Sequence, residues 1–209
     1  MPRIDAVIFD CDGTLVDSEP LANAALVDAL ATLNIHISLG EAMRRYVGGR
    51  MADCVADIEQ RTGRKLPDSF VPELRTRTSE VFRSRLRPME GAEETLAALM
   101  VPACVASSGP MEKIELSLGV TGLARFFARD RVFSAYDVGA WKPDPKLFLH
   151  AANMLDVAPQ HCAVVEDSLP GVQAGTNAGM RTFWFRPHRA IPDSVTALHR
   201  LMDFPKLLA

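Results

Sequence analysis

Hydrophobic positions follow three different patterns along the chain and divide it into three segments. Residues 1–16 contain one continuous apolar run, at 6–9, which predicts a buried strand. Residues 17–87 place apolar side chains at helical spacing, as in the stripe along 71–85, and contain no convincing strand. From residue 88 onward, short apolar runs alternate with helical patterns. The middle segment is therefore expected to be an all-helical insertion after the first strand.

The third segment predicts a parallel sheet. Its apolar runs predict strands at 103–106, 131–133, 162–165 and 182–185, with helices near 111–118, 145–155 and 170–178. Alternating strands and helices form parallel sheets that are covered on both faces. We therefore expect an α/β fold with a Rossmann-like parallel-sheet core formed by residues 1–16 and 88–209. A small α-helical domain, residues 17–87, is inserted after the first strand.

Composition narrows the class of protein. Of the 209 residues, 48% are hydrophobic and 23% are charged, as in ordinary folded proteins. A net charge of −3 argues against nucleic-acid binding, and no apolar run approaches the length of a membrane span. The four cysteines have no close pair and no metal-ligand spacing, which indicates free thiols. We expect a cytoplasmic protein, monomeric or weakly homo-oligomeric, with no nucleic-acid or membrane partner.

Polar residues follow the predicted strands. They are Asp10 and Asp12 after the first strand, Ser107 and Ser108 after the second, Lys142 beyond the third, and Glu166 and Asp167 after the fourth. Ligands collect at the carboxyl ends of parallel strands, so these side chains are expected to converge on one edge of the sheet. By contrast, Cys11 alternates away from its aspartate neighbours and is expected to pack rather than react.

These residue types suit phosphoryl transfer. Carboxylates and a backbone carbonyl are ligands that Mg²⁺ prefers, and a carboxylate can also attack phosphorus as a nucleophile. Lys142, Ser107 and the helix N-terminus behind Ser107 would stabilise the charge of a phosphoryl group. Asp12 is placed to protonate the leaving oxygen and later to deprotonate the attacking water.

In these residues the chain resembles the haloacid dehalogenase superfamily over nearly its whole length. The segment 10–14 is similar to the nucleophile loop of that family, and Ser107 to its second motif. Lys142, within Lys-Pro-Asp-Pro, is similar to the third motif, and the segment 166–168 to the fourth. The insertion, residues 17–87, is similar to the helical cap of the branch that contains phosphoglucomutases and phosphoglycolate phosphatases.

The resemblance implies a role for each matching residue. Asp10 would be the nucleophile and a metal ligand, and Asp12 the acid/base that also gives its carbonyl to the metal. Asp167 would ligate the Mg²⁺ with support from Glu166. The phosphate-binding residues would be Ser107, Ser108 and Lys142. Two arginines of the helical insertion, Arg45 and Arg50, are candidates for an anionic substrate tail, whereas the arginines of 75–87 are expected to form a solvated helix face.

Asp12 discriminates among the reactions of the superfamily. Dehalogenases usually carry a non-acidic residue at that position, and phosphonate-cleaving relatives lack the acid and use a cap lysine; Lys65 is the only lysine of residues 17–87. Resembling phosphoglucomutases place a histidine where this chain has Ala22. The sequence therefore favours a phosphatase, while a sugar-phosphate mutase and a non-catalytic binding or regulatory relative remain as alternatives.

The expected partner is a small phosphorylated metabolite. The segments 133–137 and 141–145 are similar to those of bacterial 6-phosphogluconate phosphatases. This resemblance implies a Mg²⁺-dependent phosphatase that acts on a small phosphorylated sugar or sugar acid through an aspartyl-phosphate intermediate.

Overall fold

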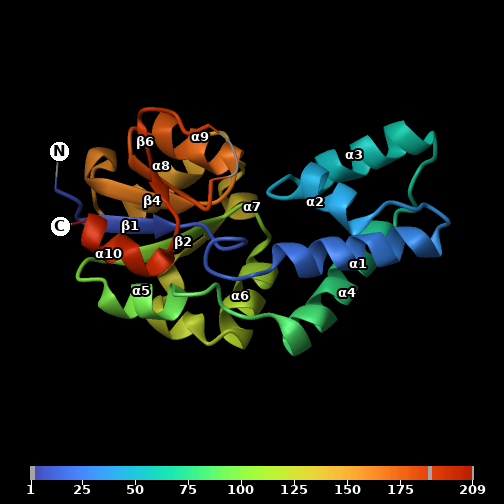
Figure 1. Ribbon diagram of the computed structural model, residues 1–209, viewed down its shortest axis with the longest axis horizontal. Helices are drawn as coiled ribbons and strands as arrows, with labels where there is room; N and C mark the ends of the chain where they lie inside the picture. The colour runs from blue at the N-terminus through green and yellow to red at the C-terminus, as the bar shows by residue number, and fades with distance from the viewer. Residues whose placement is uncertain (1–2, 188–189, 209) are drawn as a thin grey trace.

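The computed structural model describes residues 3–187 and 190–208. A six-stranded sheet with its covering helices lies at one end of the molecule, and helices α1–α4 lie together at the other (Figure 1). Every neighbouring pair of strands is parallel, in the order β3-β2-β1-β4-β5-β6. The strands are β1 (Ala6–Phe9), β2 (Ala103–Ser107), β3 (Val132–Ser134), β4 (Cys162–Glu166), β5 (Arg181–Phe185) and β6 (Val195–Leu198).

Helices cover both faces of the sheet, which explains why the central strands are apolar throughout. On one face, Val7 and Phe9 pack with side chains of α5, α6 and α10, and on the other face Ala6 and Ile8 pack with α8 and α9. A strand that is buried on both sides has no position for a polar side chain until it ends. The helices of the core are α5 (Ala92–Ala98), α6 (Met111–Val120), α7 (Ala135–Val138), α8 (Lys146–Met154), α9 (Leu169–Asn177) and α10 (Phe204–Leu207), with short 3-10 helices at Leu123–Phe126, Arg129–Arg131, Pro159–His161 and Leu201–Asp203.

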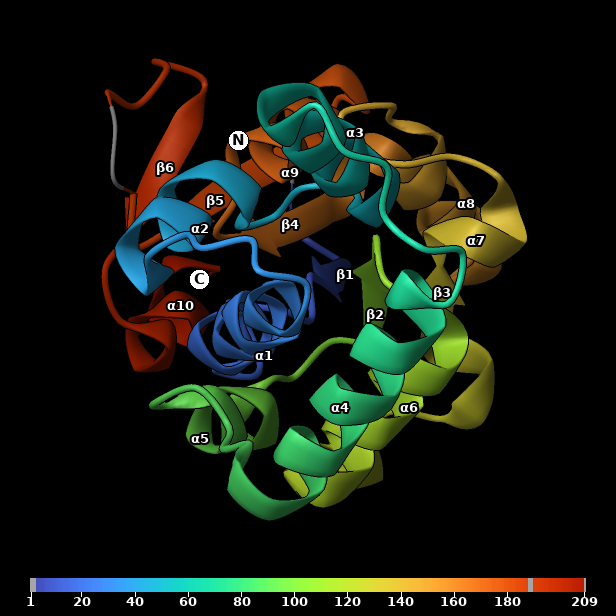
Figure 2. The same ribbon diagram turned by 90° about the vertical axis from the view of Figure 1, so that its right-hand side faces the viewer.

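The helical segment has an apolar cluster of its own. Its helices are α1 (Glu19–Thr32), α2 (Leu39–Tyr46), α3 (Met51–Thr62) and α4 (Phe70–Arg85). The cluster includes Leu30, Ile58 and Leu74. These side chains come from three different helices and are almost fully buried. The segment leaves and rejoins the core at adjacent points, where the Asp17 amide donates to the Arg87 carbonyl at 3.1 Å. Viewed from the end, α1–α4 lie in front of the strand ends (Figure 2).

The predicted α/β fold is confirmed, with differences at its margins. The strand predicted at 131–133 begins and ends one residue later, and the helices α6, α8 and α9 differ by one or two residues from their predicted bounds. The strand β6 and the helix α5 were not predicted from the sequence. Only two of the four residues of β6 are buried, because it lies at the sheet edge, so it lacks the continuous apolar run that marks the central strands.

In the part of the chain that the structure describes, no helix is both long enough and apolar enough to cross a membrane. All four cysteines are free and buried.

Candidate active site

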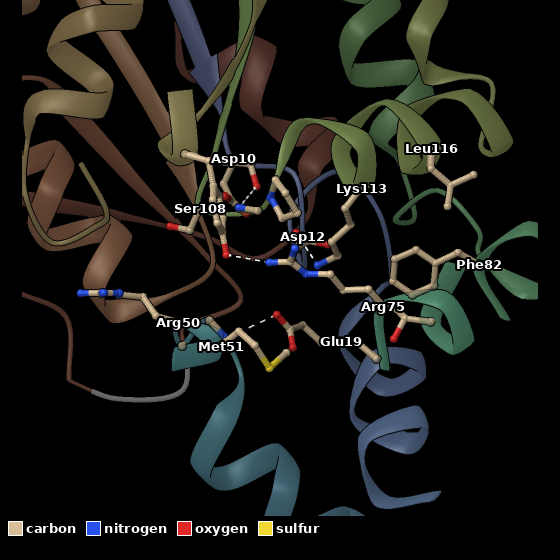
Figure 3. A pocket seen from close by; sticks show the side chains of 18 of the residues that line it. Asp10, Asp12, Glu19, Arg50, Met51, Arg75, Phe82, Ser108, Lys113 and Leu116 are labelled. Atoms are coloured by element: carbon tan, nitrogen blue, oxygen red, sulfur yellow. Dashed lines mark hydrogen bonds and ion pairs between the residues drawn. The ribbon is translucent and has the colours of Figure 1, made fainter. Parts of the chain in front are cut away.

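A cavity of about 480 Å³ lies between the carboxyl ends of the strands and the helical segment. The structure brings the predicted residues together here from four loops, and Figure 3 shows Asp10, Asp12 and Ser108 among the side chains that line the cavity. Its lining includes all seven residues predicted from the strand ends: Asp10, Asp12, Ser107, Ser108, Lys142, Glu166 and Asp167. Helices α1, α3 and α4 contribute the opposite wall.

Lys142 lies at the centre of the buried part of the site. Its Nζ is 2.5 Å from Oδ1 of Asp10 and 2.6 Å from Oε1 of Glu166, and all three side chains are more than 90% buried. Asp10 directly follows β1 and Glu166 ends β4, and the two strands are hydrogen-bonded neighbours. Burial alone would lower the pKa of Lys142, but the two carboxylates raise it well above its usual value, so the lysine stays charged.

Both carboxylate oxygens of Glu166 accept hydrogen bonds. Its Oε1 accepts from Lys142, and its Oε2 accepts from the backbone amide and the hydroxyl of Ser168, both at 2.8 Å. Gly171, in the first turn of α9, lies directly against this carboxylate: a Cβ built there would be 1.9 Å from the carboxyl carbon of Glu166. The geometry therefore makes Glu166 an anchor for Lys142 as well as a candidate metal ligand.

Three carboxylates could hold a metal ion: Asp10, Glu166 and Asp167 each offer an oxygen within 4.8 Å of the others. Burial raises the pKa of Asp10 to about 8. Lys142 acts to lower this pKa, and the negative charge of Glu166 offsets part of that lowering. Burial and the neighbouring carboxylates also raise the pKa of Asp167 well above its usual range. Its Oδ1 accepts a hydrogen bond from Thr14 at 3.2 Å. An oxygen-rich cluster with this unfavourable concentration of negative charge suits a hard divalent cation.

Asp12 is held by two contacts that differ from those of Asp10. The Ser18 hydroxyl donates to its Oδ1 at 2.6 Å, and Lys113 Nζ lies 2.9 Å from its Oδ2. Burial raises the pKa of Asp12, but Lys113 and Ser18 more than offset this effect and lower it below its usual value. The two aspartates of the loop, Asp10 and Asp12, therefore have pKa values shifted in opposite directions.

Two further charged residues of the cavity, Lys113 and Glu19, were not predicted from the sequence. Lys113 lies in the first turn of α6. Its position a few residues after Ser107 was the only signal in the sequence that pointed to the site. Glu19 opens α1 and lines the cavity, where its Oε1 accepts from the Gly48 amide at 3.3 Å. Burial raises the pKa of Glu19 to about 7, although Lys113 acts in the opposite direction.

Ser107 and Ser108 occupy the turn between β2 and α6. The Ser107 side chain is buried, and its Oγ accepts from the Gly109 amide at 3.0 Å. Helix α6 begins at Met111, so the backbone amides of its first turn, which have no partner within the helix, lie close behind this turn. Both hydroxyls line the cavity next to Lys142. The turn therefore offers neutral and partly positive donors for an anion.

The arginines differ from the sequence expectations. Arg50 lines the cavity as expected, with its Cζ 5.1 Å above the ring of Trp141. Arg45, the other arginine expected to reach the substrate, is not among the described residues that line the cavity. Its guanidinium instead pairs with Glu41 at 3.2 Å and with Asp57 at 3.8 Å inside the helical segment.

Two arginines of α4 also differ from expectation. Arg75 and Arg83 are exposed, as expected for a solvated helix face, but they also line the cavity, which the sequence did not predict. The apolar stripe of α4 was visible in the sequence, but the sequence does not show which neighbouring surface its polar positions would meet.

Cys11, between the two aspartates, has the predicted orientation. Its side chain is fully buried in the apolar cluster on the α5 and α6 face of the sheet. Burial and the neighbouring aspartates raise the pKa of its thiol well above the usual value, so it is protonated and unreactive.

Comparison with known proteins agrees with this geometry. The family model of the haloacid dehalogenase-like hydrolases matches residues 4–179. The 6-phosphogluconate phosphatase of Escherichia coli (strain K12) is 36% identical over 212 residues, which cover 99% of this chain and 96% of the relative. Hexitol phosphatase B of the same organism is 31% identical, covering 86% of this chain and 82% of the relative.

A solved structure of a conserved haloacid dehalogenase-like protein from Agrobacterium tumefaciens has a similar fold. It superposes with a TM-score of 0.83 at 29% identity, covering 98% of this chain and 97% of the other. The likeness therefore includes both the sheet and the helical segment.

Proposed function

Because the chain belongs to the haloacid dehalogenase-like hydrolase family and is a phosphatase of that family, we propose that it is a Mg²⁺-dependent phosphatase of a small phosphorylated sugar or sugar acid, which reacts through an aspartyl-phosphate intermediate. The observation that carries this proposal is the buried contact of Lys142 with Asp10 and Glu166, beside Asp167 and open to one cavity. It combines a nucleophile, a fixed cation and a cation-binding carboxylate at one point.

Binding of the phosphoryl group is proposed for the turn after β2 and for Lys142. Ser107, Ser108 and the N-terminal amides of α6 donate hydrogen bonds to phosphoryl oxygens, and the Lys142 ammonium balances their charge. Since Glu166 holds Lys142 in place, this cation is oriented before the substrate arrives. Preorganised charge of this kind stabilises the transition state without reorganisation during the reaction.

In the proposed first step, the Asp10 carboxylate attacks phosphorus while the bond from phosphorus to the leaving alcohol oxygen breaks. Asp12 gives a proton to that oxygen, so that a neutral alcohol departs and a phosphoryl group remains on Asp10. In the second step, Asp12 takes a proton from water as its oxygen attacks the same phosphorus. Inorganic phosphate leaves, Asp10 is again a free carboxylate, and Asp12 passes its proton to the departing phosphate or to solvent, which returns it to the base form.

The separate environments of the two aspartates support this division of roles. Asp10 lies in the buried carboxylate cluster, whereas Asp12 is oriented toward the cavity by Ser18 and Lys113. With its lowered pKa, Asp12 is in the base form before substrate binds, and an arriving phosphate monoanion can supply the proton that it later gives to the alcohol.

A Mg²⁺ ion suits the oxygen cluster of Asp10, Asp167 and Glu166, and the family resemblance adds the backbone carbonyl of Asp12 as a further ligand. When bound, it supplies positive charge for the phosphoryl oxygens and relieves the repulsion among the carboxylates. Asp167 is the residue most suited to it. Its backbone carbonyl accepts from the Trp184 indole at 2.8 Å, which fixes the residue, while Thr14 is the described side chain that donates to its carboxylate.

We propose that residues 17–87 form a cap domain, whose helices α1–α4 close over residues 1–16 and 88–209. The cap turn at Gly48 lies against the core: a Cβ at that position would be 2.9 Å from Cβ of Ser168. Closure of the cap excludes bulk water while the phosphoryl group is transferred. The substrate class follows from the relatives, whose names give 6-phosphogluconate and hexitol phosphates as substrates.

The proposal is tested by assaying purified protein with Mg²⁺ against a panel of sugar phosphates, sugar-acid phosphates and phosphoglycolate. Release of inorganic phosphate is the expected result, and the absence of turnover of every phosphoester would contradict it. Conversion of a hexose 1-phosphate to its isomer would instead indicate a mutase. Ala22, which lines the cavity where resembling mutases carry a histidine, argues against that alternative.

A further inference from the structure

The helical segment lines the cavity with three arginines and one carboxylate, Glu19, so its side of the cavity carries an excess of positive charge. Three arginines line it: Arg50, Arg75 and Arg83. Arg50 lies 3.8 Å from the carboxylate of Asp53, whereas Arg75 donates to a neutral hydroxyl, that of Tyr136. These arginines come from the helical segment, whereas Lys142 comes from the core, so they offer positive charge to a second anionic group of the substrate.

Arg75 is the arginine of this wall that is aimed into the cavity. Figure 3 shows its side chain extending from α4 into the cavity, whereas the Arg50 side chain points in a different direction. Arg75 Nη2 donates to the hydroxyl of Tyr136 at 3.2 Å, and its Cζ lies 5.7 Å from the centre of the same ring. Tyr136 comes from the core, so this contact joins the cap to the core.

The aromatic side chains of the core hold this arrangement together. The rings of Tyr136 and Trp141 are edge to face, with their centres 5.2 Å apart, and Trp141 in turn lies beneath Arg50. Trp141 directly precedes Lys142 in the chain. A guanidinium that is supported by a ring and one hydroxyl keeps further N–H donors free for a ligand. The guanidinium, although exposed, thus has a defined contact with the core that does not neutralise it.

We propose that Arg75 is a specificity-determining residue that binds a carboxylate on the substrate, at the end of the sugar chain remote from the phosphate. This inference rests on the proposed phosphatase function and narrows its substrate class from sugar phosphates to phosphorylated sugar acids. The planar guanidinium matches a carboxylate with two parallel hydrogen bonds. A neutral hydroxymethyl group at the same position offers no charge and only one oxygen. Tyr136 is the positioning residue that presents the guanidinium.

The test compares two substrates that differ only at this end. In 6-phosphogluconate the carbon remote from the phosphate is a carboxylate, and in glucitol 6-phosphate it is a hydroxymethyl group. We expect the native protein to prefer the acid by about 10- to 100-fold in kcat/KM, as for hydrogen bonds to a charged group. Arg75→Gln should remove most of this preference by raising KM for the acid. Arg75→Lys, which keeps the charge without the planar fork, should retain part of it, and Tyr136→Phe should weaken it.

Arg77→Gln is the matched control. Arg77 is exposed on the same helix and is not among the described residues that line the cavity, so its loss should leave the preference unchanged. Equal kcat/KM values for the two substrates in the native protein would overturn the proposal, as would an Arg75→Gln variant that keeps the preference. Equal loss on both substrates would also overturn it, because that outcome is expected from a purely structural role.

Calorimetric binding of both compounds to the Asp10→Asn protein separates this inference from the proposed function. Tighter binding of the acid that depends on Arg75 supports the inference even if no phosphoester is hydrolysed, and the absence of turnover then contradicts only the phosphatase proposal. Turnover of both compounds with equal affinities overturns the role of Arg75 and leaves the phosphatase proposal intact.

Discussion

Lys142 Nζ lies 2.6 Å from Oε1 of Glu166, and the other oxygen of Glu166 is held by the amide and hydroxyl of Ser168. The lysine is therefore held by a carboxylate that is itself fixed by Ser168. Removing one partner of such a buried charge pair destabilises the protein, because the remaining charge is left buried without compensation. Positioning of Lys142 should consequently be sensitive to any change that displaces the Glu166 carboxylate.

Gly171→Ala should impair both stability and activity. The new Cβ would meet the Glu166 carboxylate at 1.9 Å, and overpacking of this kind typically costs about 1–3 kcal/mol. Displacement of Glu166 releases Lys142, so kcat should fall at least about tenfold, which is roughly 1.4 kcal/mol of transition-state stabilisation. Urea unfolding and steady-state kinetics measure the two effects.

Gly119→Ala is the control for this prediction. Gly119 also lies inside a helix, and a Cβ there meets nothing within 4 Å. This substitution should be neutral or stabilise the protein by up to about 1 kcal/mol, with unchanged kcat. Equal behaviour of the two variants would contradict the anchoring of Lys142 by Glu166.

Asp10→Asn and Asp12→Asn should fail at different points of the reaction. Loss of the Asp10 nucleophile should abolish turnover, because no aspartyl-phosphate can form. Asp12→Asn removes the acid/base and should lower kcat by about 10²–10⁴-fold. The measurement is release of inorganic phosphate in a single turnover and at steady state. Retained turnover in Asp10→Asn would refute the assignment of the nucleophile.

Magnesium should stabilise the protein through Asp167. Relief of the repulsion among Asp10, Glu166 and Asp167 makes the ion bind the folded state, and at 100 times its Kd it would contribute about 2.7 kcal/mol. For a chain of this size, that corresponds to a rise in Tm of about 5–10 °C. Asp167→Asn should lose most of this rise while remaining at least as stable without Mg²⁺. Thermal unfolding with MgCl₂ or a chelator measures it, and an equal rise in the variant would contradict the site.

Glu19 should make the stability of the metal-free protein fall as the pH rises. Burial raises its pKa from 4.5 to about 7, with Lys113 and Asp12 as its charged neighbours and Gly48 and Asn23 as its hydrogen-bond donors. Between these two pH values the folded state binds more protons than the unfolded state, so its stability decreases with pH. Ionised Glu19 should cost about 2 kcal/mol above pH 7, since it stays partly open to solvent in the cavity.

Glu19→Gln tests this effect in the same window. The variant should match the native protein near pH 4.5 and become more stable than it by pH 8, when both are unfolded in urea without Mg²⁺. A stability difference between the two proteins that is independent of pH would show that Glu19 does not ionise in this range.

Some site residues could be predicted from the sequence because they follow strands that are buried on both faces. Asp10 and Asp12 end the apolar run of β1, and Glu166 and Asp167 end that of β4, so the parallel sheet brings them to one edge whatever the rest of the chain does. The edge strand β6 lacks such a run and escaped prediction for the same physical reason.

The residues that face the cavity from helices could not be predicted in this way. Lys113 and Arg75 both lie on polar faces of amphipathic helices, where a lysine or arginine in solvent has the same local pattern. Only the packing of α4 against the core decides that Arg75 meets Tyr136 while Arg77 does not line the cavity, and that Arg45 pairs inside the cap.

The sequence by itself thus determined the fold class and the edge of the sheet at which the polar residues meet, because hydrophobic burial along each strand forces its polar end residues to a common edge. Its resemblance to the haloacid dehalogenase superfamily indicated the reaction class. The tertiary structure decided how Lys142 is anchored, how Asp12 is paired and which arginines reach the cavity. These relationships join groups on different elements, from Asp12 on a loop to Lys113 on α6, and the distances between them depend on helix rotation and closure. No local pattern along the chain encodes those quantities, and the substrate depends on them.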